Sequence, residues 1–206
     1  IELVTGKYSR QTIIPRLDLK EGIPDYAKTL VVITTLITSK EKIPDLIKRL
    51  EGFYYSNRDK NITFGVLADF KDSKNPEEER DRELISALSD AFNEINIRYD
   101  NEPFVLFLRK RTYNKREGRY MGWERKRGAI TELIRFIKGE ETSILTFVGS
   151  RKKIAETKYI ITLDSDTNLR IDSAKEMVFS MLHPINKAEI DNEKGIVTNG
   201  YGILQP

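Results

Sequence analysis

The feature that most constrains the fold is the alternation of short apolar runs with longer amphipathic segments along the chain. The runs are rich in β-branched residues and apolar on both faces, which is typical of strands buried in a parallel sheet. They cover residues 29–36, 61–69, 104–108 and 159–163. Because a helix-length segment separates each run from the next, we predict right-handed βαβ crossovers. The predicted fold class is therefore α/β, a doubly wound, mostly parallel sheet with helices on both faces.

Apolar residues at three- and four-residue steps predict the helices between these strands. One helix is expected to begin near Pro44, and a second at Asn75-Pro76, which offers a cap and a first-turn proline. Later helices are expected at residues 128–138, with Ile134 facing inward, and at residues 172–182.

The chain length of 206 residues suits one α/β domain and is short for two. We therefore predict a single domain over residues 1–206, with residues 1–28 as an extended lead-in along the surface and residues 195–204 as a closing strand. Because the sequence starts without Met and stops directly after a strand-like run, we expect both ends to lie inside a longer protein.

Composition excludes several classes of protein. The absence of cysteine excludes a disulfide framework and cysteine-based zinc sites, and the single histidine, His183, excludes multi-histidine metal centres. The longest mostly apolar stretch, residues 29–38, falls below the roughly 18 residues of a membrane span. The start of the chain lacks the apolar core of a signal peptide. A net charge of +3 is too small to indicate nucleic-acid binding by itself.

A pair of acids ends the fourth apolar run. Asp164 and Asp166 are two residues apart, so on extended backbone both carboxylates can face the same side. Two negative charges at a strand end are costly unless a cation or hydrogen-bond donors compensate them. Oxygen ligands suit Mg²⁺ or Mn²⁺, and Mg²⁺ commonly binds one or two carboxylates together with substrate phosphates. The pair predicts a divalent-metal and diphosphate site, and the alternative is a polar turn that caps the next helix.

A second acid and a basic stretch follow neighbouring strands. Asp69 ends the second run, where an acid can accept a hydrogen bond from a nucleotide base or ribose. Residues 109–127 hold nine Lys and Arg side chains, of which we interpret residues 109–119 as a solvated basic loop. Lys126 and Arg127 lie next to a helix start and are the better candidates for binding a diphosphate. Among the aromatic residues of this stretch, Trp123 is expected to pack in the core.

Five segments in this order resemble the glycosyltransferase domain of cyclic β-1,2-glucan synthases. They are TLVVITTL, FGVLADFKD, MGWERKRGAI, YIITLDSDT and GYGILQP. The first four also resemble inverting glycosyltransferases of the GT-A type in general, in which a Rossmann-like domain binds a nucleotide-diphosphate sugar. The resemblance covers nearly the whole chain.

The resemblance implies a UDP-glucose donor, a glucan acceptor, a divalent metal (Mg²⁺ or Mn²⁺) and inverting transfer that builds β-1,2-glucan. Asp164 and Asp166 match the motif that binds metal and diphosphate, Asp69 matches the acid on the uridine side, and Lys126 matches a basic residue near the diphosphate. Thr34 and Thr35 lie where such enzymes line the nucleotide pocket. The predicted donor-binding residues are Thr34, Thr35, Asp69, Lys126, Arg127, Asp164 and Asp166.

The general base of an inverting transferase, and the Gln-x-x-Arg-Trp-type acceptor motif, are expected beyond Pro206. The chain is therefore expected to bind donor and to lack transfer activity alone. The resemblance also implies that its partners are the remaining domains of a large synthase in the bacterial inner membrane, with this region facing the cytoplasm.

Two other functions use the same residues. A strand followed by Asp-x-Asp-x-Thr also resembles the first motif of haloacid-dehalogenase-type phosphatases, in which Asp164 would be the nucleophile and Asp166 the acid. Alternatively, the basic stretch could make a non-enzymatic domain that binds nucleic acid or acidic lipid. Glu117 and Glu124 interrupt that stretch, so we do not expect a nucleic-acid partner.

Overall fold

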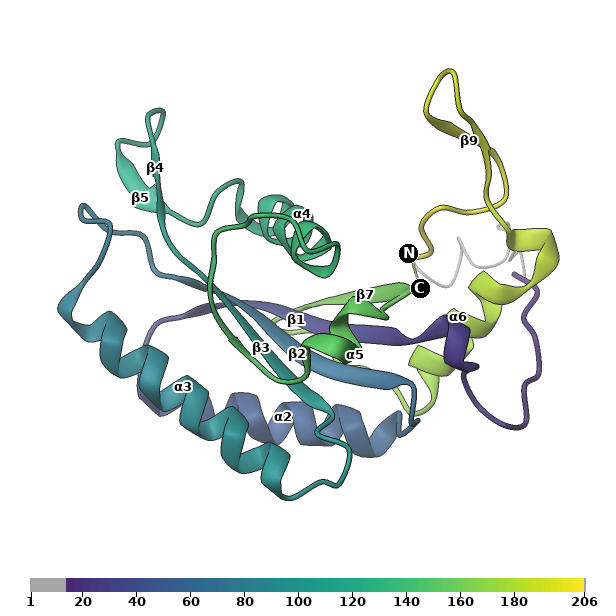
Figure 1. Cartoon of the computed structure of the whole chain (residues 1–206), viewed down its shortest axis with the longest axis horizontal. Coiled ribbons are helices and arrows are strands. Elements are labelled where there is room, and N and C mark those ends of the chain that lie inside the picture. The colour runs from purple at the N-terminus through teal and green to yellow at the C-terminus, as the bar shows by residue number, and fades with distance from the viewer. Residues whose placement is uncertain (1–13, 206) are drawn as a thin grey trace, which may run out of the picture.

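The computed structural model describes residues 14–205, which form one central sheet with helices on both of its faces (Figure 1). The sheet has five strands in the order β6-β3-β2-β1-β7. Four strands run parallel, and β6 pairs antiparallel with β3 at one edge. The strands are β1 (Thr29–Ile37), β2 (Ile62–Phe70), β3 (Phe104–Arg109), β6 (Ile144–Val148) and β7 (Tyr159–Asp164). The predicted α/β fold with a mostly parallel, doubly wound sheet is confirmed.

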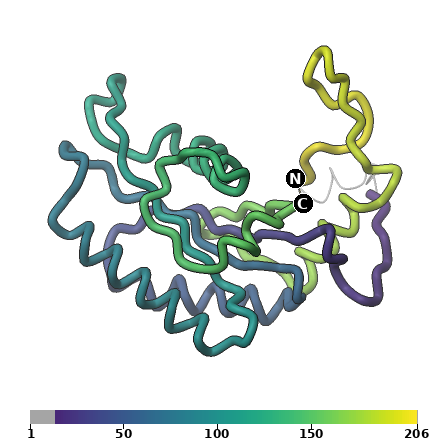
Figure 2. The backbone as a smooth tube through the Cα atoms, in the orientation of Figure 1, coloured from purple at the N-terminus to yellow at the C-terminus, as the bar shows by residue number. Residues whose placement is uncertain are grey.

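The helices divide between the two faces of the sheet (Figures 1 and 2). One face packs against α2 (Ile43–Ser56), α3 (Glu79–Ile97) and α6 (Ser173–Leu182). The other packs against α4 (Arg125–Ile137) and the short α5 (Arg151–Ala155). Because strand side chains alternate, Val31 and Ile33 of β1 join the first core while Leu30 and Val32 join the second.

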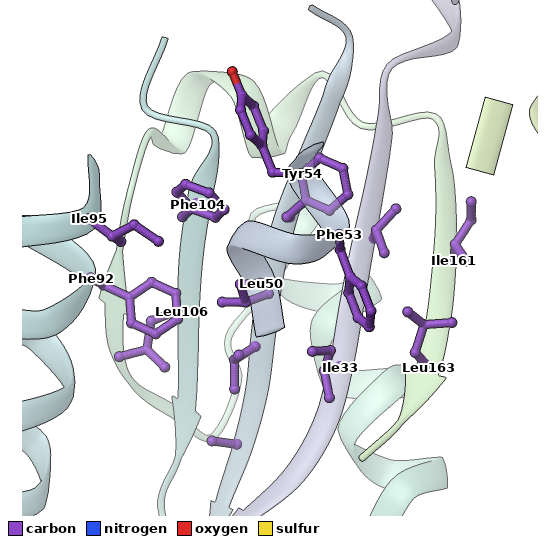
Figure 3. Packing of buried hydrophobic residues seen from close by; sticks show 14 of the residues in the cluster. Ile33, Leu50, Phe53, Tyr54, Phe92, Ile95, Phe104, Leu106, Ile161 and Leu163 are labelled. Atoms are coloured by element: carbon purple, nitrogen blue, oxygen red, sulfur yellow. The ribbon is translucent and has the colours of Figure 1, made fainter. Parts of the chain in front are cut away.

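The larger core fixes α2 across the middle of the sheet. Leu50, Phe53 and Tyr54 of this helix are buried against strand residues that include Ile33 and Phe104 (Figure 3). Burial of a Leu or Phe side chain contributes about 1.5–3 kcal/mol. These buried side chains hold α2 firmly against the sheet, so the helix also gives its other side chains a fixed position.

Four helix starts were predicted, and those of α3 and α4 are wrong. Helix α4 begins at Arg125 rather than near residue 128, and α6 begins at Ser173, close to the expected residue 172. Helix α2 begins as expected, with Pro44 in its first turn. Helix α3 begins at Glu79 rather than at Asn75-Pro76, because Glu78 caps it in a reciprocal arrangement with Asp81. The Pro76 carbonyl instead accepts a hydrogen bond from Arg111, at 3.4 Å, which holds the preceding segment outside the helix.

Several shorter elements differ from the prediction. Strand β6 and the hairpin of β4 (Thr112–Asn114) and β5 (Arg119–Met121) were not predicted. The expected closing strand at residues 195–204 is wrong: β9 (Ile196–Asn199) pairs with β8 (Glu189–Asp191) in a hairpin apart from the central sheet (Figure 1). The hairpin closes on itself, so these residues add no strand to the sheet.

Some burial predictions also change. Ile134 is 40% exposed and does not face inward, since Ala129, Leu133 and Phe136 form the buried side of α4. Trp123 is 44% exposed and is not a core residue.

Of the expected lead-in, residues 1–13 lie outside the described residues, and the remainder is not purely superficial. It forms a 3₁₀ helix at Asp25–Ala27, and Ile23 and Ala27 join the larger core. No helix within residues 14–205 combines the length and the apolar character needed to cross a membrane.

Candidate functional site at the carboxyl edge of the sheet

The carboxyl ends of the four parallel strands meet at one edge of the sheet, where ligands bind in open α/β folds. Thr34 of β1 pairs in register with Asp164 of β7. Leu36 of β1 pairs with Asp69 of β2, and Asp69 in turn pairs with Arg109 of β3. The structure therefore brings the predicted acids and the start of the basic stretch to a single edge.

Asp164 and Asp166 lie in a turn at the end of β7. Asp164 is the last residue of the strand, and its carbonyl accepts a hydrogen bond of 3.1 Å from the Thr167 N–H. Both acids are exposed. The Asp164 Oδ1 accepts a hydrogen bond from Lys126 Nζ at 2.6 Å, with the two side chains 59% and 44% exposed. The basic start of α4 and the Asp-x-Asp strand end, each predicted separately to bind a diphosphate, are in direct contact.

The donor set at this turn fits a hard divalent cation bound in part by another molecule. Within residues 14–205, no group of three or more His, Cys, Asp or Glu side chains is arranged to hold a metal ion. Mg²⁺ usually takes one or two carboxylates from the protein and completes its shell with water and substrate phosphates. Asp164 and Asp166 can supply those two carboxylates, so the residues fit an ion that binds together with a diphosphate.

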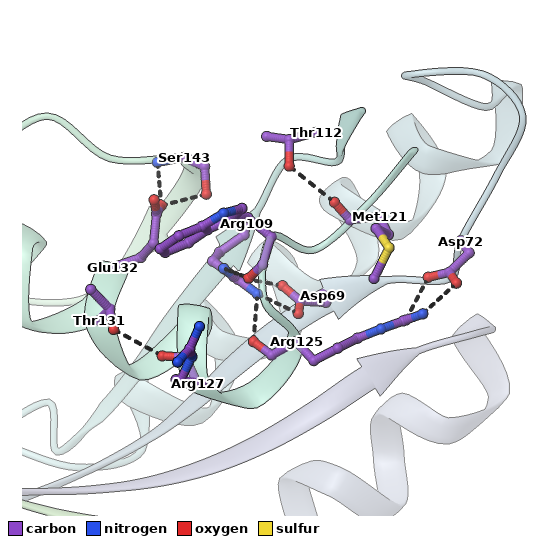
Figure 4. A network of polar contacts seen from close by, with 11 residues as sticks. Asp69, Asp72, Arg109, Thr112, Met121, Arg125, Arg127, Thr131, Glu132 and Ser143 are labelled. Carbon is purple, nitrogen blue, oxygen red and sulfur yellow. Dashed lines mark hydrogen bonds and ion pairs between the residues drawn. The ribbon is translucent and has the colours of Figure 1, made fainter. Parts of the chain in front are cut away.

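Asp69 of β2 and Arg109 of β3 form a buried ion pair at the same edge of the sheet (Figure 4). Arg109 Nε lies 2.7 Å from Asp69 Oδ1 and Nη2 lies 2.6 Å from Oδ2, and the side chains are 0% and 11% exposed. The same guanidinium donates to the carbonyls of Trp123 and Arg125, both at 3.2 Å. The interpretation of Arg109 as part of a solvated loop is therefore wrong, because its charge is paired with an acid 40 residues away in sequence.

The loop that leads into α4 and the first turn of that helix lie directly on this ion pair because each contains a glycine. A Cβ at Gly122 would lie 2.3 Å from Asp69 Oδ2, and a Cβ at Gly128 would lie 1.9 Å from the Trp123 carbonyl oxygen. Between them, Glu124 and Arg125 adopt positive φ angles of 54° and 53°. The segment Gly-Trp-Glu-Arg-Lys-Arg-Gly thus turns sharply over the Asp69–Arg109 pair and delivers Lys126 to Asp164.

Two further Arg–Asp pairs support the same edge. Arg125 and Asp72 form two hydrogen bonds of 2.8 Å, and this contact raises the pKa of Arg125 above its usual value. Arg111, also placed in the solvated loop by the sequence analysis, is buried and donates to Asp81 and to the Lys71 carbonyl. Burial alone would raise the pKa of Asp81, but hydrogen bonds from Arg111 and from the Glu78 N–H outweigh it and hold that pKa below its usual value.

The remaining predicted residues have different surroundings. Thr34 Oγ1 donates to the Leu163 carbonyl at 3.2 Å, beside the acid pair. Thr35 is the next residue on β1 and is partly buried. Arg127 pairs with Glu124 at 3.0 Å, and among the described residues it has no ion pair with Asp164 or Asp166.

Sequence reasoning missed one residue at this edge, Arg49 of α2. Its guanidinium donates to the carbonyls of Ser165 and Thr167, on either side of Asp166. No local pattern distinguishes Arg49 from the other charged residues of α2, because its partners lie 116 and 118 residues further along the chain.

Comparison with known proteins identifies a related sequence. No protein-family model matches the chain. The chain is 36% identical over 190 residues to cyclic β-(1,2)-glucan synthase NdvB of Rhizobium meliloti (strain 1021), a match that covers 90% of this chain. The chain spans about 7% of the length of that relative. The chain is therefore related to one segment of a much longer glucan synthase.

Proposed function

We propose that this chain is the donor-binding part of a metal-dependent inverting glucosyltransferase of the GT-A type, which uses UDP-glucose to build β-1,2-glucan. The observation that carries the proposal is the acid pair Asp164 and Asp166 at the carboxyl end of β7, in a chain related to a cyclic β-1,2-glucan synthase. The wider protein would supply the acceptor site, the general base and the membrane-embedded domains. Residues 1–206 would form a single nucleotide-sugar-binding domain.

The chemistry available at this edge suits departure of a nucleoside diphosphate. A divalent cation held by Asp164 and Asp166 would neutralise negative charge that develops on the leaving diphosphate. Lys126 lies at the start of α4, where an ammonium group and free backbone N–H groups both favour phosphate oxygens. Thr34 and Thr35 would line the nucleotide pocket from β1, and Arg127 would add positive charge beside Lys126.

Asp69 has a more limited role in this proposal than its position alone suggests. Both of its oxygens accept hydrogen bonds from Arg109, yet an ionised carboxylate has about four acceptor sites. Asp69 can therefore contact the uridine side of a donor while it holds Arg109. Its larger contribution is to anchor the loop that carries Lys126.

Calorimetric titration of UDP-glucose, with and without Mn²⁺, tests the site. We expect the wild type to bind UDP-glucose only when Mn²⁺ is present. Asp164→Ala and Asp166→Asn should each abolish this metal-dependent binding, and their circular dichroism spectra should match the wild type. Asp100→Asn is the matched control, because Asp100 is an exposed acid in the loop before β3, at the opposite edge of the sheet. This control should bind like the wild type.

Equal binding by the wild type and both site variants, with or without Mn²⁺, would refute the assignment. The phosphatase alternative makes a different prediction, namely turnover of a phosphomonoester with a covalent phosphate on Asp164. Incubation with glucose 1-phosphate, followed by mass analysis of the protein, distinguishes the two. The relationship to a glucan synthase supports the transferase.

A further inference from the structure

We propose that Arg49 is a positioning residue that fixes the turn at Asp164–Thr167 for metal binding, a role that rests on the donor site proposed above. Arg49 lies in the middle of α2, on the helix that the larger core holds against the sheet. Its Nη1 donates to the Ser165 carbonyl and its Nη2 to the Thr167 carbonyl. Ser165 and Thr167 are the residues before and after Asp166, so one side chain holds the backbone on both sides of that residue.

The geometry of the guanidinium group explains why an arginine suits this position. Its two Nη atoms belong to one rigid planar fork and can reach two carbonyls at once, whereas an ammonium group presents a single point charge. The group also lies 5.4 Å from the centre of the Phe53 ring, one helical turn further along α2. Because Phe53 is buried, the guanidinium group lies against a fixed ring as well as against the two carbonyls.

The third guanidinium nitrogen of Arg49 shows that the side chain depends on its contacts with the turn. Its Nε is buried and has no hydrogen-bond partner among residues 14–205. A buried donor without a partner is unfavourable, so other contacts of the same group must compensate for it. The hydrogen bonds to the Ser165 and Thr167 carbonyls and the packing on Phe53 provide this compensation. The position of Arg49 therefore depends on its contact with the turn.

Around the turn, every anchor holds a group other than the Asp166 carboxylate. Thr34 holds the Leu163 carbonyl at 3.2 Å, and Lys126 holds the Asp164 carboxylate at 2.6 Å. Arg49 holds the two carbonyls beside Asp166. Within the described part of the chain, the Asp166 carboxylate itself accepts no side-chain hydrogen bond and forms no ion pair. The backbone is thus fixed while the ligand group stays accessible, which is the arrangement that favours tight binding.

Loss of Arg49 should therefore weaken metal binding more than it weakens the fold. Removal of a group that orients a metal ligand typically lowers metal affinity 10–100-fold. We expect Arg49→Met to weaken the binding of Mn²⁺ with UDP by roughly tenfold or more. Arg49→Lys should restore little of this affinity, because lysine keeps the charge but cannot bridge two carbonyls. Lys48→Met is the matched control, since Lys48 is the exposed cation next to Arg49 on α2, and it should leave the affinity unchanged.

Electron paramagnetic resonance of Mn²⁺ measures both the affinity, from the free-ion signal, and the environment of the bound ion. The bound spectrum of Arg49→Met should differ from that of the wild type. The rise in melting temperature produced by Mn²⁺ and UDP should also shrink, because that rise depends on affinity. Millimolar ethylguanidinium should partly restore affinity to Arg49→Ala. If Arg49 only stabilised the fold, its substitution would lower the melting temperature equally with and without metal.

The positioning role alone would be overturned if the wild type binds Mn²⁺ with UDP and Arg49→Met shows the same affinity and the same spectrum of bound Mn²⁺. Absence of Mn²⁺ and UDP binding in the wild type would overturn this role and the proposed donor site together. If Arg49→Met fails to fold, Arg49→Lys decides the question. Wild-type affinity in Arg49→Lys would then contradict the requirement for a two-pronged donor.

Discussion

The ion pair of Arg109 and Asp69 gives the sharpest quantitative prediction about this fold. Substitution of Arg109 by Met would leave the nearly buried Asp69 carboxylate without the cation that forms its ion pair. It would also remove the donor from the carbonyls of Trp123 and Arg125. Removal of one partner from a buried ion pair typically costs about 3–5 kcal/mol, because the remaining charge stays desolvated. We predict a loss of this size in the free energy of unfolding of Arg109→Met.

A second pair in the same region provides the control. Arg125 and Asp72 have the same two-bond geometry, with both distances at 2.8 Å, but the Arg125 side chain is 49% exposed. Exposed pairs contribute about 0–1 kcal/mol. Since 1 kcal/mol shifts the melting temperature of a domain of this size by about 2–4 °C, Arg109→Met should melt about 6–20 °C lower and Arg125→Met at most about 4 °C lower.

Urea unfolding followed by circular dichroism measures both free energies. The double variant Arg109→Met with Asp69→Leu should recover part of the loss, because replacement of a whole buried pair by apolar side chains removes the stranded charge. The reasoning would be refuted if Arg109→Met were no less stable than Arg125→Met. A double variant as unstable as Arg109→Met alone would also contradict it.

Two further predictions concern Lys126 and Asp81. In Lys126→Met, Mn²⁺ alone should bind roughly three- to tenfold more tightly, because a charge repulsion on the order of 1 kcal/mol is removed. UDP-glucose with Mn²⁺ should bind this variant more weakly, because the cation beside the diphosphate is lost. Titrations of Mn²⁺ with and without nucleotide would show these opposite changes, and weaker binding in both would contradict the reasoning. The pKa of Asp81 in the folded state lies below its unfolded value of about 3.9, so its ionised form stabilises the fold above that value and the contribution disappears as the pH falls through the folded pKa. The difference in urea midpoint between wild type and Asp81→Asn should therefore shrink between about pH 7 and pH 3, and a constant difference would count against this assignment.

The sequence was sufficient to predict the parallel strands and the edge at which their acids gather. Those strands are apolar on both faces, and that pattern depends on local residues alone. Strand β6 was missed because a run of only five residues carries little periodicity. The β8–β9 hairpin was taken for a sheet strand because a short run does not reveal its pairing partner.

Within the site, the contacts that could not be predicted are those between distant residues. Arg109 was assigned to a solvated loop because arginine is usually exposed, and only the position of Asp69 on the neighbouring strand makes its burial favourable. Arg49 was missed for the same reason. Lys126 and Asp164 could be anticipated, because a helix start and a strand end at the same sheet edge must lie close together.

The balance of charge at this edge bears on both the metal and the basic stretch. Five of the nine cations of residues 109–127 are ion-paired, namely Arg109, Arg111, Arg125, Lys126 and Arg127. The four others lie on or beside the β4–β5 hairpin, so the stretch is not a continuous positive surface for nucleic acid. Arg109, Arg125 and Lys126 each face an acid at this edge, namely Asp69, Asp72 and Asp164, so much of their charge is already neutralised before a diphosphate arrives. An added cation held by Asp164 and Asp166 would supply further positive charge, which is why we expect donor affinity to depend on a divalent metal.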